Sequence, residues 1–255
     1  MPDTWRKIPE GTLNDVWTNG KEVRRKTSVQ SPLVHRFVKY LNAKESYTPK
    51  LIRSNEAFEY FEYVPGKTIN LPWPRVMTDR KWIVEIAKWL SKHHKTASHF
   101  KFIKGDISAW GPVEDLSLFP CHGDLGPWNF LTDEGTLKSV IDWDLLRPGK
   151  STDDLAQLAT EHVPLRPPEP EHPSPFSQAE LTERLDLLLD TYGFLKTRKE
   201  FLILCLNYLK ELETDIAKVG NQSTPPFSPC MMKLNQRGEH MRYAQTAEYI
   251  REHWF

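Results

Sequence analysis

The spacing of apolar residues divides the chain into a short strand-rich part and a longer helical part. Two short runs, Asp15–Thr18 and Lys21–Lys26, flank an Asn-Gly pair, which is the strongest short-range signal of a β-hairpin. Apolar residues at helical spacing follow over Ser31–Leu41, and the alternating aromatic run Ala57–Val64 predicts a further strand. The first part is therefore expected to fold as strand, strand, helix, strand.

The pattern changes at Thr78, where apolar residues begin to recur at helical spacing. A long helix is expected first, and residues 163–175 then interrupt the helical pattern because they are rich in proline. The order of elements predicts an α+β chain of two lobes, a β-rich lobe of residues 1–64 and a mainly helical lobe of residues 65–255. Further helices are expected at Gln178–Tyr192, Lys199–Val219 and Met231–His253.

Composition excludes several classes of partner. Lys+Arg and Asp+Glu both number 34, so the chain has no overall field to attract nucleic acid or an anionic membrane. The N-terminus lacks a secretory apolar region, and no apolar run is long enough to span a bilayer. Three cysteines without a Cys-x-x-Cys pair argue against a disulfide framework or a structural zinc site. We expect a soluble, cytoplasmic protein without nucleic-acid or membrane partners.

The candidate chemistry lies around a second predicted hairpin. Two short apolar strands, Phe130–Leu131 and Leu137–Ile141, flank a loop that contains a glycine. Folding the chain about residue 135 or 136 places Asn129 opposite Asp142. Asp124 lies five residues before Asn129, on the loop that leads into the first strand. Three oxygen-bearing side chains are therefore expected to converge.

An amide oxygen beside a carboxylate suits a magnesium ion, which takes only one or two ligands from protein and completes its shell with water and phosphates. Asn129 and Asp142 fit that pair, and Asp124 is then available to accept a proton from a substrate hydroxyl during phosphoryl transfer. The alternative is a solvated turn in which Asn and Asp side chains serve as local caps.

These residues also carry a resemblance to a known family. The strings His122-Gly-Asp124-x-x-x-x-Asn129 and Ile141-Asp-Trp-Asp144, followed by Gly149 and Asp154-Leu-Ala156, resemble the signature of the aminoglycoside phosphotransferase and choline kinase superfamily. The resemblance implies a protein-kinase-like two-lobed fold, with ATP and Mg²⁺ as cofactors. It also implies a small molecule as hydroxyl acceptor.

The resemblance further implies roles for individual residues. His122 would join Asp124 in the catalytic group by holding the catalytic loop, and Asp154 would support that loop. Asp144 would be an additional metal or water ligand. The adenine would hydrogen-bond to backbone groups around Glu62–Val64.

Arg25 would replace the phosphate-gripping lysine of a kinase, because Val23 and Arg25 share one face of a strand. Lys26 is the competing candidate for that role. The helix Pro32–Asn42 contains no glutamate to pair with this cation, and His35 stands at the corresponding place.

Protein kinases differ from this sequence at several positions. The chain lacks a G-x-G-x-x-G motif, and Gly11–Asn14 is its nearest glycine-bearing loop; position 126 is not lysine, and Asp142 is followed by Trp-Asp. We therefore expect a small-molecule acceptor, either an aminoglycoside-like antibiotic or an amino-alcohol metabolite. Glu161, Glu169 and Glu171 could attract a cationic acceptor or could form an acidic surface loop. A non-catalytic nucleotide-binding regulatory protein of the same fold is the alternative function.

Overall fold

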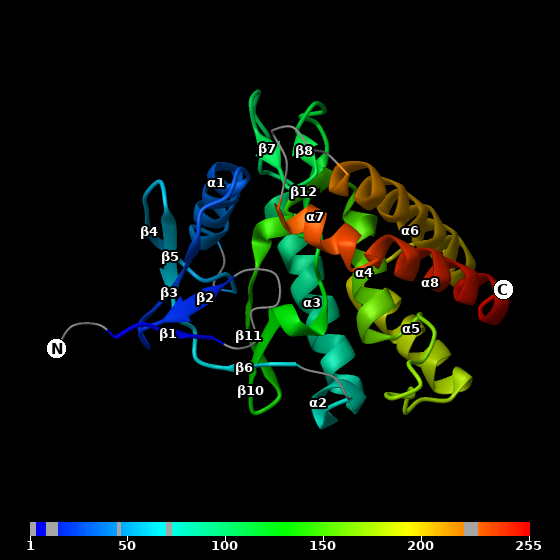
Figure 1. Cartoon of the computed structure of the whole chain (residues 1–255). Helices are drawn as coiled ribbons and strands as arrows, with labels where there is room; N and C mark the ends of the chain where they lie inside the picture. The colour runs from blue at the N-terminus through cyan, green and yellow to red at the C-terminus, as the bar shows by residue number, and fades with distance from the viewer. Residues whose placement is uncertain (1–3, 9–14, 45–46, 70–72, 222–228) are drawn as a thin grey trace.

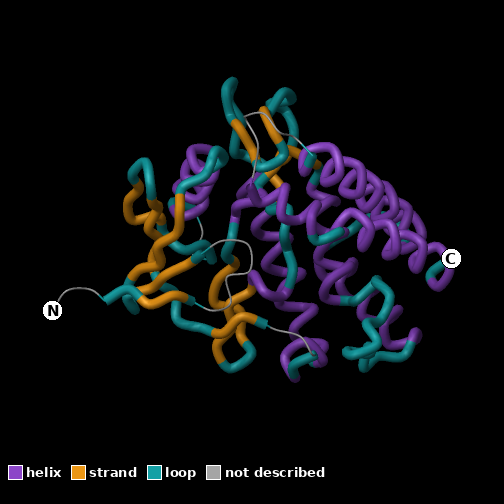
Figure 2. Tube along the Cα trace, viewed as in Figure 1, coloured by secondary structure: helices purple, strands orange, loops and turns teal. Residues whose placement is uncertain are grey.

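The computed structural model describes residues 4–8, 15–44, 47–69, 73–221 and 229–255. In Figure 1 the first part of the chain, drawn in blue and cyan, forms a sheet with one helix beside a larger helical body. Figure 2 shows most of the strands towards the N-terminal side and most of the helices on the other side, with one helix beside the N-terminal sheet. The predicted glycine-bearing loop Gly11–Asn14 lies outside the described residues.

The N-terminal lobe is built on an antiparallel sheet whose strand order is β1-β2-β3-β5-β4. The predicted hairpin of β2 and β3 is confirmed. Of its two turn residues, Gly20 has a positive φ of 85° and Asn19 does not. The side chain of Asn19 instead accepts hydrogen bonds from the amides of Lys21 and Glu22. The outer two strands were not predicted. The strands are β1 (Arg6–Lys7), β2 (Val16–Thr18), β3 (Glu22–Lys26), β4 (Leu51–Ser54) and β5 (Phe58–Glu62).

Helix α1 (Ser31–Asn42) connects this sheet to the rest of the molecule. Its apolar stripe is fully buried and belongs to a cluster that includes Phe61 of β5 and Trp143 from the second part of the chain. The rings of Phe37 and Trp143 meet edge to face, with centroids 5.3 Å apart. The helix therefore packs on both the sheet and the segment that carries the candidate chemistry.

The C-terminal lobe is mainly helical, as predicted. Helix α4 was missed, and the last predicted helix is divided by Gly238, which takes a positive φ of 75° and ends α7 before α8 begins. Ser177 and Thr197 begin α5 and α6 as capping boxes with Glu180 and Glu200. The helices are α2 (Arg75–Thr78), α3 (Arg80–Ala97), α4 (Ser151–His162), α5 (Gln178–Tyr192), α6 (Arg198–Gly220), α7 (Pro229–Gln236) and α8 (Glu239–His253).

Short strands lie where the two lobes meet (Figure 1). Strand β6 (Lys67–Thr68) pairs with β10 (Phe130–Asp133), which forms the predicted hairpin with β11 (Thr136–Val140). The chain thus enters the second lobe by adding a strand to the hairpin. Two further pairs are β7 (Ile107–Ser108) with β8 (Gly111–Pro112), and β9 (Phe119–Cys121) with β12 (Arg147–Gly149). No helix in the described ranges is long and apolar enough to cross a membrane.

Candidate active site

Helix α4 supports the loop that follows β9 through hydrogen bonds to its backbone. The backbone amide of His122 donates to Asp154 Oδ2 at 3.1 Å, and that of Leu125 donates to Gln157 Oε1 at 2.9 Å. Gln157 Nε2 donates in turn to the carbonyl of Gly123 at 3.1 Å. Asp154 therefore supports the loop, as the resemblance implied, and Gln157 is a second support that sequence reasoning missed.

The backbone conformation of this loop depends on two glycines. Gly123 takes a positive φ of 80°, and a Cβ atom there would lie 2.3 Å from the carbonyl oxygen of Leu145. A Cβ atom on Gly126 would lie 2.1 Å from the ring of Trp128. Neither position tolerates a side chain without movement of its neighbours.

His122 lies beneath the loop, with no exposed surface. Its Nδ1 accepts the amide of Asp124 at 3.2 Å, and its Nε2 lies 3.1 Å from the carbonyl oxygen of Ile141, to which it donates. Burial lowers the pKa of His122 to about 4, so the ring is neutral. His122 thus joins the loop that carries Asp124 to the segment after β11.

Asp124 and Asn129 are brought together by η1 (Pro127–Asn129), a single turn of 3₁₀ helix. Asn129 Nδ2 donates to the backbone oxygen of Asp124 at 2.8 Å and to its Oδ2 at 2.7 Å. Trp128 Nε1 donates to the same Oδ2 at 3.1 Å. Because its amide nitrogen faces Asp124, Asn129 has its amide oxygen left for a cation.

The pKa of Asp124 is raised to about 7, first because the partly buried carboxyl is poorly solvated and then because Asp142 is negatively charged nearby. Hydrogen bonds from Trp128 and Asn129 act in the opposite direction. A carboxyl group in this range suits proton transfer from a hydroxyl near neutral pH.

Asp142 follows β11, but its place in the hairpin differs by one residue from the prediction. Phe130 pairs with Val140, and the register shifts between Leu131 and Thr132, so Asn129 faces Ile141, whose amide donates to its carbonyl at 2.9 Å. Asp142 comes next and takes a left-handed conformation with φ of 62°. The difference arises at the turn, because Asp133 pairs with Thr136 and the strands therefore return earlier than predicted; the bulge then offsets half of that displacement.

Arg25 reaches this centre from the other lobe. Its Nη1 lies 2.9 Å from Asp142 Oδ1 and its Nη2 lies 2.7 Å from Asp144 Oδ1. Lys26, the competing candidate, is exposed at the end of β3. Arg25 is thus the strand cation that faces the candidate metal ligands, and Asp144, a predicted metal ligand, is engaged by this guanidinium.

The carboxylate that pairs with Arg25 is Glu59, which sequence reasoning missed. Arg25 and Glu59 face each other across β3 and β5, and Arg25 Nε lies 2.5 Å from Glu59 Oε1. His35 Nε2 lies 2.6 Å from Glu59 Oε2. Burial alone would raise the pKa of Glu59, but Arg25 and His35 more than offset it and hold that pKa below its usual value.

The strand end expected to bind adenine is partly used within the sheet. The amide of Glu62 donates to the carbonyl of Lys50 at 2.8 Å, and that of Tyr63 to the carbonyl of Lys21 at 2.9 Å. The backbone of Val64 forms no hydrogen bond with another described residue. The amides of Glu62 and Tyr63 are therefore used within the sheet, whereas the backbone of Val64 is not engaged by another described residue.

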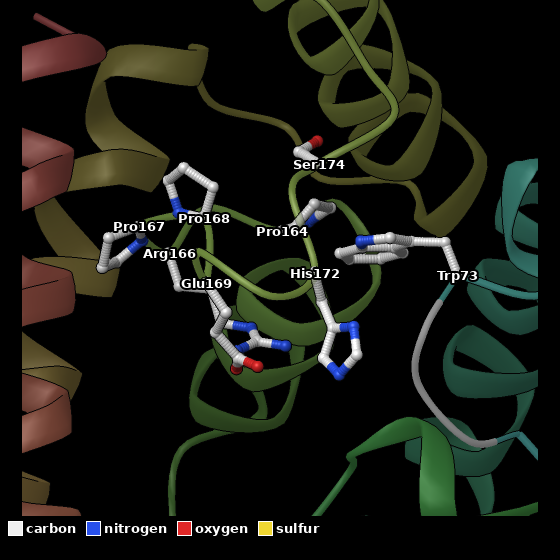
Figure 3. Close-up of a pocket in the computed structure, with 8 residues that line it drawn as sticks. All are labelled: Trp73, Pro164, Arg166, Pro167, Pro168, Glu169, His172 and Ser174. Carbon is white, nitrogen blue, oxygen red and sulfur yellow. The ribbon is translucent and has the colours of Figure 1, made fainter.

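The acidic residues proposed to attract a cationic acceptor are largely paired with arginines. Glu161 is buried on α4 instead of lying in a surface loop, and its Oε1 accepts from Arg242 Nη2 at 2.6 Å. Arg166 Nη1 lies 2.5 Å from Glu169 Oε1, beside the pocket that Figure 3 shows between the proline-rich loop and Trp73. The charges of Glu161 and Glu169 are thus compensated by arginines, whereas Glu171 lies exposed on the surface.

The comparisons with known proteins concern the family likeness and the fold of the chain. A family model described as "Phosphotransferase enzyme family" matches residues 107–175, a range that contains Asp124, Asn129 and Asp142. No curated protein matches the chain.

Several solved structures share the fold across almost the whole chain. An amicoumacin kinase in complex with AMP-PNP, Ca²⁺ and Ami has a TM-score of 0.64 at 13% identity, covering 97% of this chain and 89% of that one. The ADP-bound aminoglycoside phosphotransferase APH(2'')-Ib has a TM-score of 0.60 at 14% identity, with coverage of 96% and 94%. A choline/ethanolamine kinase family protein from Mesorhizobium loti has a TM-score of 0.58 at 14% identity, with coverage of 98% and 88%.

These matches confirm the predicted α+β, kinase-like fold and the resemblance that the sequence motifs carry. The chain has the fold of the aminoglycoside phosphotransferases and the choline/ethanolamine kinases.

Proposed function

We propose that the protein is an ATP- and Mg²⁺-dependent phosphotransferase that moves the γ-phosphoryl group to a hydroxyl of a small molecule. The observation that carries the proposal is the centre itself. Asp124 is hydrogen-bonded to Asn129 at 2.7 Å, and Arg25 of the other lobe lies 2.9 Å from Asp142. A proton acceptor, two oxygen ligands for a cation and a guanidinium for phosphate are the parts that phosphoryl transfer requires.

The donor atoms fit a hard divalent cation. Asn129 offers an amide oxygen and Asp142 a carboxylate with 39% side-chain exposure, so both could hold Mg²⁺ that also contacts phosphates and water. Asp144 would join them once Arg25 releases it. The bound ion would neutralise charge on the phosphates.

The nucleotide would lie between the lobe of residues 1–64 and the lobe of residues 65–255. The backbone at the end of β5, from Glu62 to Val64, would serve the adenine, and Arg25 would bind phosphate oxygens. In the transfer step the acceptor oxygen bonds to the γ-phosphorus while the bond from that phosphorus to the β,γ-bridging oxygen breaks. ADP leaves with the bond's electron pair, and Asp124 accepts the hydroxyl proton.

The acceptor class is left open by the residues near Asp124. Glu161 adds negative charge that reaches Asp124, but Arg242 and Arg166 accompany it. Because this charge is compensated, neutral and zwitterionic hydroxyl compounds suit the site as well as the polycationic aminoglycosides. An acceptor panel must therefore include amino-alcohols, choline-like amines and macrolides.

A non-catalytic nucleotide-binding role is the second candidate. It is favoured by one observation, the replacement of the expected helix glutamate by His35. The arrangement of Asp124 weighs against it, because nucleotide binding alone needs no proton acceptor beside the cation ligands.

The test is acceptor-stimulated release of ADP from ATP in the presence of Mg²⁺, measured across that panel. Asp124→Asn is the inactive variant, and Asp133→Asn is its matched control, since Asp133 lies exposed at the end of β10. The proposal predicts stimulation by one acceptor class in the wild type and in Asp133→Asn, and none in Asp124→Asn. Equal turnover in all three proteins would refute it.

A further inference from the structure

Arg25 bridges three carboxylates that come from different parts of the fold. Its Nε lies 2.5 Å from Glu59 Oε1, its Nη1 lies 2.9 Å from Asp142 Oδ1, and its Nη2 lies 2.7 Å from Asp144 Oδ1. The residue is 9% exposed. A single guanidinium thus holds both of the carboxylates that the proposed function assigns to the metal.

One end of this guanidinium is fixed. Glu59 is 1% exposed, lies directly opposite Arg25 in the sheet and is held on its other oxygen by His35 of α1. Glu59 is acceptor-only when ionised, so it can keep the Nε–H while the two terminal nitrogens change partners. Arg25 can therefore exchange ligands without leaving the sheet.

The terminal nitrogens of Arg25 would compete with a cation for the same carboxylate oxygens. The oxygens of Asp142 and Asp144 that bond Arg25 are carboxylate oxygens of the kind that bind Mg²⁺. A positive charge within 3 Å of them repels a second cation and occupies their lone pairs. A metal ion that binds these two oxygens must therefore displace the terminal nitrogens of Arg25.

Phosphate provides the partner to which those nitrogens can move. Guanidinium groups bind phosphate oxygens through paired hydrogen bonds, as they bind carboxylates. A nucleotide whose phosphates lie between the lobes would draw Nη1 and Nη2 of Arg25 away from Asp142 and Asp144. The same step would expose the metal ligands and add phosphate oxygens for the metal.

We propose that Arg25 couples the two ligands of this site, by blocking the metal from Asp142 and Asp144 until a nucleotide engages its terminal nitrogens. The inference rests on the proposed function, because it requires that a nucleotide and a divalent cation bind here. Coupling of this kind is reciprocal, so the metal in turn strengthens nucleotide binding.

The test is titration with Mn²⁺, an oxygen-seeking substitute for Mg²⁺ whose free form is observed by electron paramagnetic resonance. Wild type, Arg25→Met and Arg24→Met are compared without nucleotide and with ADP, after subtraction of Mn²⁺–ADP binding measured without protein. Arg24 is the matched control, because it lies one residue away on the other face of β3, 4.7 Å from the Trp5 ring centroid and 4.8 Å from that of Phe58.

The proposal predicts that Arg25→Met binds Mn²⁺ alone about tenfold more tightly than wild type, within the usual range of coupling between sites. ADP should enhance Mn²⁺ binding less in Arg25→Met than in wild type, and Arg24→Met should behave as wild type. If Arg25→Met fails to fold, Arg25→Met/Glu59→Gln replaces it, since this double variant leaves no unpaired buried carboxylate at residue 59.

Two results would count against the proposal, and they differ. Mn²⁺ binding that is equal in wild type and in the folded Arg25 variant, with ADP-dependent binding present in both, would overturn the coupling and leave the proposed function standing. Absence of any ADP-dependent Mn²⁺ binding to wild type would overturn the proposed function itself.

Discussion

The loop that carries Asp124 and the N-terminal sheet both hold charged side chains in place, but they use different parts of the chain to do so. Asp124, Asn129 and Asp142 lie within one loop and one hairpin, supported from α4. Arg25 and Glu59 come from two strands that α1 and β4 separate along the chain. The first arrangement depends on backbone geometry, whereas the second depends on an ion pair between distant residues.

The two regions are therefore expected to respond differently to amino-acid substitutions. The loop is fixed by backbone hydrogen bonds and by Gly123, so damage there should change folding and chemistry together. In the sheet, the backbone ladder between β3 and β5 does not involve these side chains, so it is expected to persist without the ion pair. Damage to Glu59 should therefore change ligand binding more than stability.

The largest effect is expected for the proton acceptor. Asp124→Asn should lower kcat by roughly 10²–10⁴-fold, the usual contribution of a general base. Nucleotide affinity should stay close to wild type, because Asn129, Asp142 and Arg25 remain. Steady-state kinetics and calorimetric titration of ADP with Mg²⁺ measure the two quantities. A parallel loss of affinity would place Asp124 among the nucleotide ligands instead.

The next effect concerns the backbone of the loop. Gly123→Ala should destabilise the protein by about 2–5 kcal/mol, because a left-handed residue is strained and its Cβ must displace a carbonyl. Gly105→Ala is the control, since Gly105 also has positive φ but nothing lies within 4 Å of an added Cβ; it should cost about 1–2 kcal/mol. Chemical denaturation measures both. Equal losses would mean that the contact with Leu145 does not constrain the loop.

A smaller effect is expected in the sheet. Glu59→Gln removes the charge that holds Arg25 Nε, so KM for ATP should rise roughly tenfold, as expected for one charge-assisted hydrogen bond. The midpoint of unfolding should change less than in Gly123→Ala. Glu56→Gln, an exposed neighbour before β5, serves as the control. If kcat fell sharply while KM stayed constant, Glu59 would act on the chemical step rather than on nucleotide binding.

The smallest effect is expected at His35, which contacts Arg25 only through Glu59. His35→Gln keeps a donor for Glu59 and should change KM for ATP about twofold or less, whereas His35→Ala should raise it several-fold, consistent with one net hydrogen bond. Initial-rate kinetics with both variants provide the test. Identical behaviour of the two would show that the bond to Glu59 is not what His35 contributes.

The same comparison explains what could be predicted from the sequence. The loop and hairpin were readable because their residues lie within a short segment, and turn chemistry at Gly135 fixes how the strands return. The tight turn between Asp133 and Thr136 alone would move the pairing two residues from the prediction, and the bulge between Leu131 and Thr132 reduces this difference to one. The sequence therefore predicted the convergence of Asp124, Asn129 and Asp142, with an error of one residue in the register of the hairpin.

Glu59 could not be identified in this way, because its role depends on which strands pair and in which register. The run around it alternates correctly for a strand, but nothing local marks residue 59 as the partner of residue 25. Helix α4 was missed for a related reason: most of its residues are buried, so it lacks the one-sided pattern that reveals a surface helix. The pairing of Glu59 with Arg25 and the helical conformation of α4 both depend on tertiary contacts that the local sequence does not reveal.

The most direct test of the account is ³¹P NMR of a mixture of ATP, Mg²⁺, the protein and the acceptor that most stimulates ADP release. The account predicts that wild type converts ATP into ADP and a phosphate monoester of the acceptor in equal amounts, and that Asp124→Asn forms neither at a comparable rate. Release of inorganic phosphate without a phosphorylated acceptor, or equal monoester formation by Asp124→Asn, would contradict it.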